Sequence, residues 1–294
     1  MILNLFVAAT IFCWGAWGIF DKKALETSSD RDVLLILYLL ALPEIPILFF
    51  ILNATVPNWH LTGSIALWSG LGSVTSSMAM FAYLFAMSRA EASYVLGITA
   101  SYPLIMQFLA CSFLGENLVV SRLIGGALIG VGVTVVGKSG KTQKSQSKRD
   151  RLIVLLCIVF ATFGWGVHGL FDKKAVELAD PLVVFFTRSL FDALTLIVFA
   201  IVLKASRVTV AINSKKTWQY AAFSALCLAI GYLCYLKALA IATASYVVVI
   251  TGCYPLLMYL LALLFLKEKF NKARFIGVLL VVAGGALVQL SQSQ

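Results

Sequence analysis

FCWGAWGIFDKKALE, residues Phe12 to Glu26, recurs as FGWGVHGLFDKKAVE at Phe163 to Glu177, with ten of fifteen positions identical. A second pair follows, because SYVLGITASYPLIMQFLACSFLGENL (Ser93 to Leu118) aligns with SYVVVITGCYPLLMYLLALLFLKEKF (Ser245 to Phe270), with fourteen identities in twenty-six. Self-similarity at a fixed long period indicates a duplicated structural unit. The chain therefore contains one unit used twice.

The composition places both units in a membrane. Of the 294 residues, 61% are hydrophobic and 12% are charged, and the mean hydropathy is +0.96. A soluble domain carries about 25% charged residues, so the long apolar blocks here indicate membrane-spanning helices. The six cysteines all fall inside these blocks and are expected to be buried thiols, not disulfides or metal ligands. No metal-spaced histidine cluster or phosphate-binding loop occurs, so no metal and no cofactor is expected.

The apolar blocks predict an all-α membrane protein of ten transmembrane helices, arranged as two inverted five-helix repeats. Residues 1–137 form the first repeat, 138–151 a basic linker and 152–294 the second repeat. Because five is an odd number, the second repeat must enter the bilayer from the opposite side, as in many secondary transporters. The predicted spans are Ile2–Phe20, Val33–Leu52, Ser64–Ser88, Ser93–Phe113, Leu118–Gly137, Leu152–Phe171, Leu182–Leu203, Trp218–Ala240, Ser245–Leu266 and Phe275–Leu290.

The loop charges predict an orientation. With the N-terminus outside, the inner loops hold eighteen lysines and arginines and the outer loops four, so the positive-inside rule favours this arrangement. Both termini are then expected outside the plasma membrane, with the linker in the cytoplasm. The net charge of +10 is explained by these loops, and no nucleic-acid partner is expected. The opening MILNLF lacks a basic segment and a cleavage site, so it is expected to start the first span and not to be a signal peptide.

Charged residues inside the predicted spans indicate a functional site. A charge at mid-bilayer costs at least about 2.5–3.5 kcal/mol unless it is paired or hydrated. Glu44 lies between Pro43 and Pro46, which loosen the helix around it, and carboxylates in such positions exchange protons in transporters. Arg188 and Asp192 are four residues apart on one helix face and are expected to pair. The alternative is a purely structural ion pair beside a packing glutamic acid.

Aromatic residues and prolines recur in both halves. Tryptophans lie in mid-span, where an interfacial aromatic belt explains them poorly, and mid-span prolines are expected to kink two spans and expose backbone carbonyls at Thr99 and Thr251. A static packing kink and a core histidine at position 168 are the alternatives. The expected substrate-binding residues are Trp14, Trp17, Glu44, Tyr83, Thr99, Tyr102, Gln107, Trp165, His168, Arg188, Asp192, Tyr235, Thr251, Tyr254 and Tyr259.

Glycines recur in spans five and ten, including Gly125, Gly126 and Gly132 and their partners Gly277 and Gly284. Small residues permit close contact between helices in membranes. These faces are expected to pack either within the fold or between the protomers of a homodimer.

The duplicated order of motifs resembles the EamA-type family of the drug/metabolite transporter superfamily. The resemblance implies a central cavity formed by spans one to four and six to nine, spans five and ten as packing helices, and alternating access for amino acids, amines or nucleotide sugars. The run Asp21-Lys22-Lys23 leaves open which lysine corresponds to the family's. The residues that carry the resemblance are Trp14-Gly15, Lys23-Ala24, Tyr102-Pro103 and Glu116, with Trp165-Gly166, Lys174-Ala175, Tyr254-Pro255 and Glu268.

These observations predict a secondary active transporter and not an enzyme. The expected solute is a small polar organic molecule, an amino acid or a related zwitterion or amine, with a proton as the coupling ion. The alternatives are a quaternary amine such as choline, a nucleotide sugar, or a membrane scaffold that transports nothing.

Overall fold

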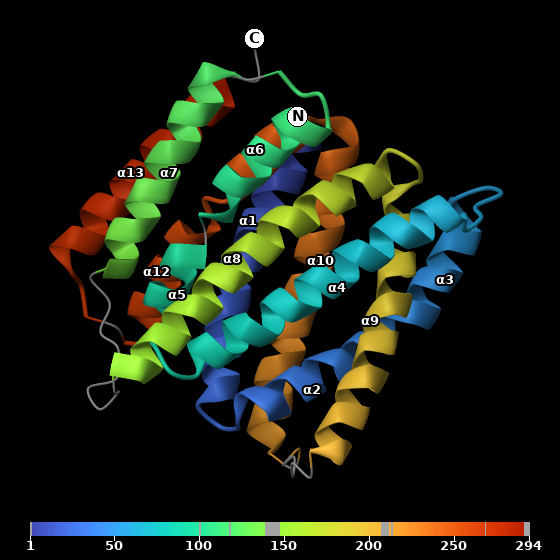
Figure 1. Ribbon diagram of the computed structural model, residues 1–294, viewed down its shortest axis with the longest axis horizontal. Helices are drawn as coiled ribbons and strands as arrows, with labels where there is room; N and C mark the ends of the chain where they lie inside the picture. Colours follow the sequence, from blue (N-terminus) through green and yellow to red (C-terminus); the bar gives the residue numbers. More distant parts are fainter. Residues whose placement is uncertain are drawn as a thin grey trace.

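The computed structural model describes residues 2–99, 101–117, 119–138, 148–206, 212, 214–267 and 269–290, and all regular structure in these ranges is helical (Figure 1). Glu268 and most of the predicted linker lie outside the described residues. The helices are α1 (Ile2–Leu25), α2 (Asp30–Ala41), α3 (Glu44–Thr55), α4 (Gly63–Met87), α5 (Ala92–Thr99), α6 (Tyr102–Phe113), α7 (Val120–Lys138), α8 (Lys148–Val176), α9 (Pro181–Ala205), α10 (Lys215–Ile241), α11 (Ala244–Thr251), α12 (Tyr254–Phe265) and α13 (Lys272–Leu290).

The helices group into the ten predicted spans, which confirms the fold class. Seven segments are long and apolar enough to cross a membrane, with α2–α3 and α11–α12 each counted as one. The pair α5–α6 and the helices α7 and α13 supply the other three. Large apolar side chains face outward, and Phe50, Phe108 and Leu264 are each at least 70% exposed. Such surfaces are unfavourable in water and are satisfied by lipid chains.

Three of the spans are interrupted at prolines. Pro43 caps the N-terminus of α3, and Pro103 and Pro255 lie in the first turns of α6 and α12. Proline lacks a backbone donor and is tolerated only at the start of a helix, so each proline begins a new helix. The kinks expected at Pro103 and Pro255 are therefore complete breaks.

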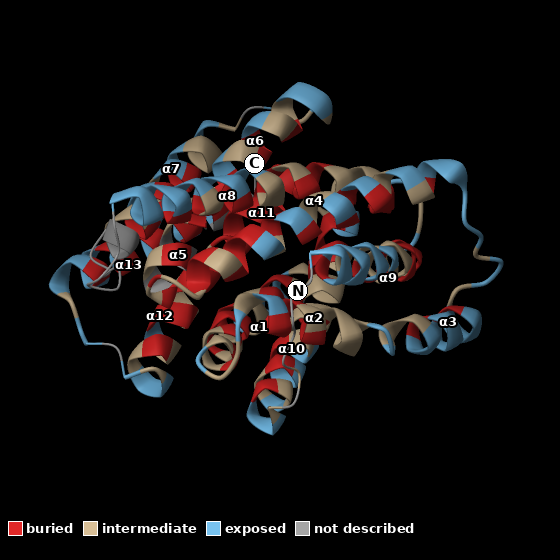
Figure 2. Cartoon of the chain, turned by 60° about the horizontal axis from the view of Figure 1, so that its bottom comes forward, coloured by how far each residue is buried: buried red, intermediate tan, exposed pale blue. Residues whose placement is uncertain are grey.

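The two halves interlock in a symmetric way. Helix α1 packs along α10, α4 packs along α8, and α7 packs along α13, so each pair joins one half to the other (Figure 1). Buried residues are most frequent on α4 and α11, which pack against helices of the other half, whereas α3 at the edge of the molecule is mostly exposed (Figure 2). The interface between the halves is thus the core of the protein.

The glycine faces of α7 and α13 contact each other within the chain. A Cβ atom added at Gly125 would lie 2.7 Å from the carbonyl oxygen of Gly284, and one added at Gly132 would overlap the carbonyl oxygen of Gly277. The side chains of other residues cannot fit there. These glycines therefore pack within the fold, as one of the two sequence-based alternatives expected.

Candidate functional site

A cavity of about 190 Å³ lies between the two halves. Its walls come from α1, α2, α4, α8, α9 and α10, together with the first residues of α3, α6 and α12. All three interrupted spans thus begin a new helix at the cavity. Ten of the fifteen predicted binding residues line it: Trp14, Trp17, Glu44, Tyr102, Trp165, His168, Arg188, Asp192, Tyr235 and Tyr254.

The other five predicted residues are buried and do not line the cavity. The ring of Tyr83 packs against Trp17 and Trp165, with centroids 5.1 and 5.3 Å away. The hydroxyls of Thr99 and Thr251 donate hydrogen bonds to carbonyl oxygens one turn earlier in their own helices, at 3.1 and 2.8 Å. The remaining two, Gln107 and Tyr259, are also buried. Tyr83 therefore supports the cavity wall from behind, whereas Gln107 lies against Gly126 of α7 and Tyr259 packs with Val278 of α13.

Aromatic rings form one side of the cavity. Trp14 lies 5.1 Å from Tyr235 and 6.0 Å from Tyr254 between ring centroids, and Trp17 lies 5.8 Å from Trp165. The indole of Trp14 reaches this place because position 231 is glycine, where a Cβ atom would lie 2.8 Å from the indole ring. The mid-span tryptophans therefore face the interior, as the sequence predicted, and not a membrane interface.

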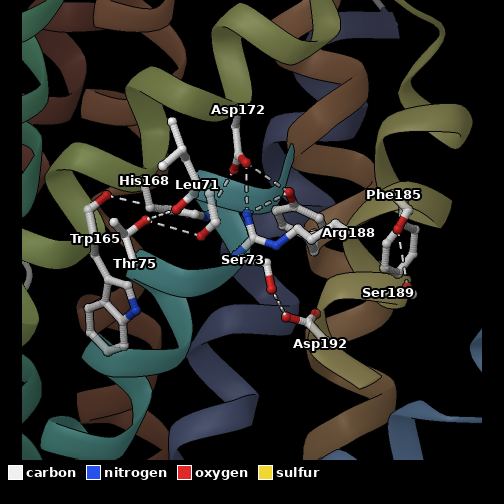
Figure 3. Close-up of polar contacts among 12 residues, drawn as sticks. Leu71, Ser73, Thr75, Trp165, His168, Asp172, Phe185, Arg188, Ser189 and Asp192 are labelled. Carbon is white, nitrogen blue, oxygen red and sulfur yellow. Dashed lines mark hydrogen bonds and ion pairs between the residues drawn. The ribbon is translucent and has the colours of Figure 1, made fainter. Parts of the chain in front are cut away.

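Next to the aromatic rings lies a network centred on Asp172, which is 0% exposed, and its His168 stacks on Tyr235 with centroids 6.4 Å apart. The Nη1 atom of Arg188 lies 2.7 Å from Oδ1 of Asp172, and His168 Nε2 lies 2.9 Å from its Oδ2 (Figure 3). Arg188 also donates a hydrogen bond of 2.9 Å to the hydroxyl of Tyr232, which donates to Asp172 at 3.0 Å. One carboxylate thus holds a guanidinium, an imidazole and a phenol together.

The prediction that Arg188 forms an ion pair with Asp192 is wrong. Arg188 pairs with Asp172 on α8, and Asp192 instead accepts a hydrogen bond from the hydroxyl of Ser73 on α4 (Figure 3). Gly72 makes room for the observed pair, since a Cβ atom there would lie 3.0 Å from Asp172 Oδ1 and 3.2 Å from Arg188 Nη1. Packing between helices, and not spacing along α9, decides the partner of Arg188.

Sequence reasoning missed Asp172 and Tyr232 as site residues. The predicted span ended at Phe171, which placed Asp172 at the membrane edge, whereas α8 continues to Val176. The recurrence of Asp21 at Asp172 was the signal that could have identified it. Further lining residues that were missed are Leu34, Leu37, Tyr38, Ala41, Ser76, Ser77, Met80, Phe185, Ala225, Leu228 and Ala229.

Asp21 is the counterpart of Asp172 in the first repeat, but its surroundings differ. It is also 0% exposed, and it accepts a hydrogen bond of 2.6 Å from the hydroxyl of Ser224. Ser224 occupies the position that corresponds to Gly72 in the other half. A serine hydroxyl therefore faces one aspartate, whereas Arg188 fills the equivalent space beside the other. The two repeats are similar in backbone and different in charge.

Lys22 and Lys173, which occupy equivalent positions in the two repeats, each cap the C-terminal end of another helix. Lys22 Nζ donates hydrogen bonds to the carbonyl oxygens of Met87 and Ala90 at 2.8 and 2.9 Å. Lys173 Nζ does the same to Leu239 and Ala242, at 2.9 and 3.1 Å. A cation at a helix C-terminus satisfies carbonyls that have no intrahelical partner. The first lysine of each Asp-Lys-Lys run is thus the structural one.

Fold and cavity together define a multi-pass helical membrane protein whose two interlocked halves enclose a solute-sized space. Residues 1–138 and 152–290 both match the family described as EamA-like transporter family. The chain belongs to this family and is a membrane transporter of the drug/metabolite type.

Two further similarities agree with the duplication and the fold. An uncharacterized protein of Methanocaldococcus jannaschii is 29% identical over 142 residues, which cover 48% of this chain and 98% of that protein. The matched length is about that of one repeat. A crystal structure of another protein superposes with a TM-score of 0.69 at 17% identity, covering 97% of this chain and 99% of the other. At this level of identity the likeness concerns the fold alone.

Proposed function

We propose that the protein is a secondary active transporter that moves a small polar organic solute, an amino acid or a related zwitterion or amine, by alternating access. The observation that carries this proposal is the cavity between the two halves, whose lining combines aromatic rings with charged side chains. Inverted repeats with sites at interrupted helices are typical of secondary transporters. The binding residues are proposed to be the ten cavity-lining ones among those predicted from the sequence.

The size of the cavity supports a small solute. Pockets that hold drug-sized ligands measure roughly 300–1,000 Å³, whereas this cavity measures about 190 Å³. A nucleotide sugar is therefore the weaker alternative. We further propose a proton as the coupling ion, exchanged at Glu44, because this carboxylate lines the cavity and lies at the start of an interrupted helix.

Counterflow in proteoliposomes tests the proposal. Vesicles preloaded with one unlabelled solute from a panel of amino acids, amines and nucleotide sugars should take up the labelled form without any nucleotide. Trp14→Ala should slow this exchange, because it removes a ring from the cavity wall. Trp59→Ala should not, because Trp59 packs outside the cavity, with its ring 5.5 Å from Phe186. A complete absence of exchange across the panel would favour a membrane scaffold instead.

Proton coupling has its own test. An imposed pH gradient should drive accumulation of the exchanged solute in the wild-type protein and not in Glu44→Gln. Accumulation that survives unchanged in Glu44→Gln would refute the role proposed for this residue.

We also propose a plasma-membrane location with both termini outside and residues 138–151 in the cytoplasm, on the strength of the loop charges. Reporter fusions after Gln294 should then be active only outside, and fusions within the linker only in the cytoplasm. The opposite pattern would show that the charge rule fails for this chain.

A further inference from the structure

The charges around the cavity do not balance. Arg188 brings one positive charge, but its guanidinium is 2.7 Å from Asp172, which is fully buried behind the lining. His168 lies against the same carboxylate, at 2.9 Å. The positive charge of Arg188 is therefore offset inside the protein, and its Nη1 atom is bound before any solute arrives.

Two carboxylates lining the same cavity have no such partner. Asp192 accepts a hydrogen bond from Ser73, and neither Asp192 nor Glu44 forms an ion pair with any residue in the described part of the chain. They come from different helices, α9 and the first residue of α3, and both contribute to the wall. Both side chains are partly buried, and a bound cation offsets the cost of burying an unpaired carboxylate.

The aromatic side of the cavity favours the same charge. Trp14, Trp17 and Trp165 line it together with Tyr235 and Tyr254. The faces of such rings carry partial negative charge and attract ammonium groups, with tryptophan the most effective. The rings and the two carboxylates line the same cavity, so a small cation bound there has both kinds of group in the wall around it.

We propose that the solute is a small monovalent organic cation, a primary or quaternary amine, held by Glu44 and Asp192 against the tryptophan side of the cavity. This inference rests on the proposed transport function and narrows its substrate class. It disfavours a zwitterion, because the carboxylate of a zwitterion would meet two carboxylates and an arginine whose charge is already offset by Asp172. It also couples solute to proton in a simple way, because both compete for the same carboxylates.

A matched set of solutes tests the proposal on the wild-type protein. The probes are choline, its uncharged isostere 3,3-dimethyl-1-butanol, the zwitterion glycine betaine, and two other cations, tetramethylammonium and ethanolamine. At least one cation should raise the thermal midpoint of the purified protein and exchange in counterflow. The neutral isostere and the zwitterion should do neither at about tenfold higher concentration.

Variants locate the binding site. Asp192→Asn and Glu44→Gln should each raise the half-saturating concentration of the active cation by about tenfold or more, because each removes one negative charge beside it. Glu177→Gln is the matched control, because Glu177 lies outside the cavity lining and its side chain is 43% exposed. It should leave the half-saturating concentration unchanged.

The outcomes separate the two proposals. Exchange of glycine betaine or of amino acids, with no response to any of the three cations, would overturn the cation proposal and leave the transport function standing. No exchange of any solute in either panel would overturn both. Cation exchange that is equally strong in Asp192→Asn and Glu44→Gln would also overturn the proposed site.

Discussion

Arg188 is the residue on which the charge balance inside the protein depends. Its side chain is buried, and it reaches from α9 to a carboxylate on α8 and a phenol on α10. The free energy needed to remove two charges from water cancels most of their Coulomb attraction in a buried ion pair. Removing one partner, however, leaves a buried charge that nothing offsets. The Asp172–Arg188 pair is therefore more important for keeping α8, α9 and α10 in position than its net energy suggests.

Asp172→Asn should destabilise the protein strongly. The substitution leaves Arg188 without its counter-charge, and breaking a buried pair in this way costs about 3–5 kcal/mol. Thermal unfolding in detergent measures the effect. Asp21→Asn is the control at the equivalent position of the other repeat, where the buried carboxylate faces a serine hydroxyl and forms no ion pair with a described residue. Equal losses in the two variants would contradict the account.

The charged residues that line the cavity could be predicted from the sequence, whereas the side chains with which they pair could not. Periodicity and the cost of burying charge identify Arg188, Asp192 and Glu44, because both are properties of the chain alone. The partner of Arg188 depends on which helices become neighbours and on Gly72, whose missing side chain leaves space for the pair. No spacing rule within one helix contains that information.

At the scale of elements, the helix breaks follow from prolines and the helix ends do not. Pro43, Pro103 and Pro255 mark the three interruptions, because proline cannot continue a helix. Helix α8 begins at Lys148 and ends at Val176, beyond the apolar block at both ends. Hydropathy marks the part of a helix that contacts lipid. The helix itself can extend further, because its backbone hydrogen bonds also form outside the apolar block.

Lys173→Met tests whether Lys173 caps the C-terminal end of α10. It removes two hydrogen bonds from a charged donor to the carbonyl oxygens of Leu239 and Ala242, where α10 turns into α11. The expected loss is on the order of 1–3 kcal/mol, with faster hydrogen exchange in the first turn of α11. Lys174→Met is the neighbouring control, because within the described residues Lys174 pairs with Glu177, at 4.0 Å, and contacts no helix end. An equal effect of both substitutions would count against a capping role.

Gly132→Ala tests the contact between α7 and α13. The added methyl group would overlap the carbonyl oxygen of Gly277 and lie 2.8 Å from the backbone nitrogen of Val281. Backbone atoms cannot rotate away, so the two helices must separate, which costs typically about 1–3 kcal/mol. Gly63→Ala has nothing within 4 Å of the new Cβ atom and should be neutral or slightly stabilising. Unchanged thermal stability of Gly132→Ala would contradict the close packing.

At the scale of the whole molecule, duplication explains both the symmetry and the way it is broken. The repeat was visible in the sequence because Trp14, Gly15 and Asp21 return at the same spacing in the second half. The inversion followed from an odd number of spans. Which faces enclose the cavity, and how Ser224 and Gly72 make the two aspartates different, required the helices to be assembled.

Transport by the proposed mechanism requires the cavity between the halves to open to each side of the membrane in turn. Ser76 lines the cavity and Ser69 is fully buried outside it, so each is replaced by cysteine in a chain whose native cysteines are serine or alanine. A membrane-impermeant thiol reagent is applied to right-side-out and to inside-out vesicles. Ser76→Cys should react in both preparations, an exchanged solute should slow both reactions, and Ser69→Cys should react in neither. Reaction of Ser76→Cys from one side only, or from neither, would contradict alternating access through this cavity.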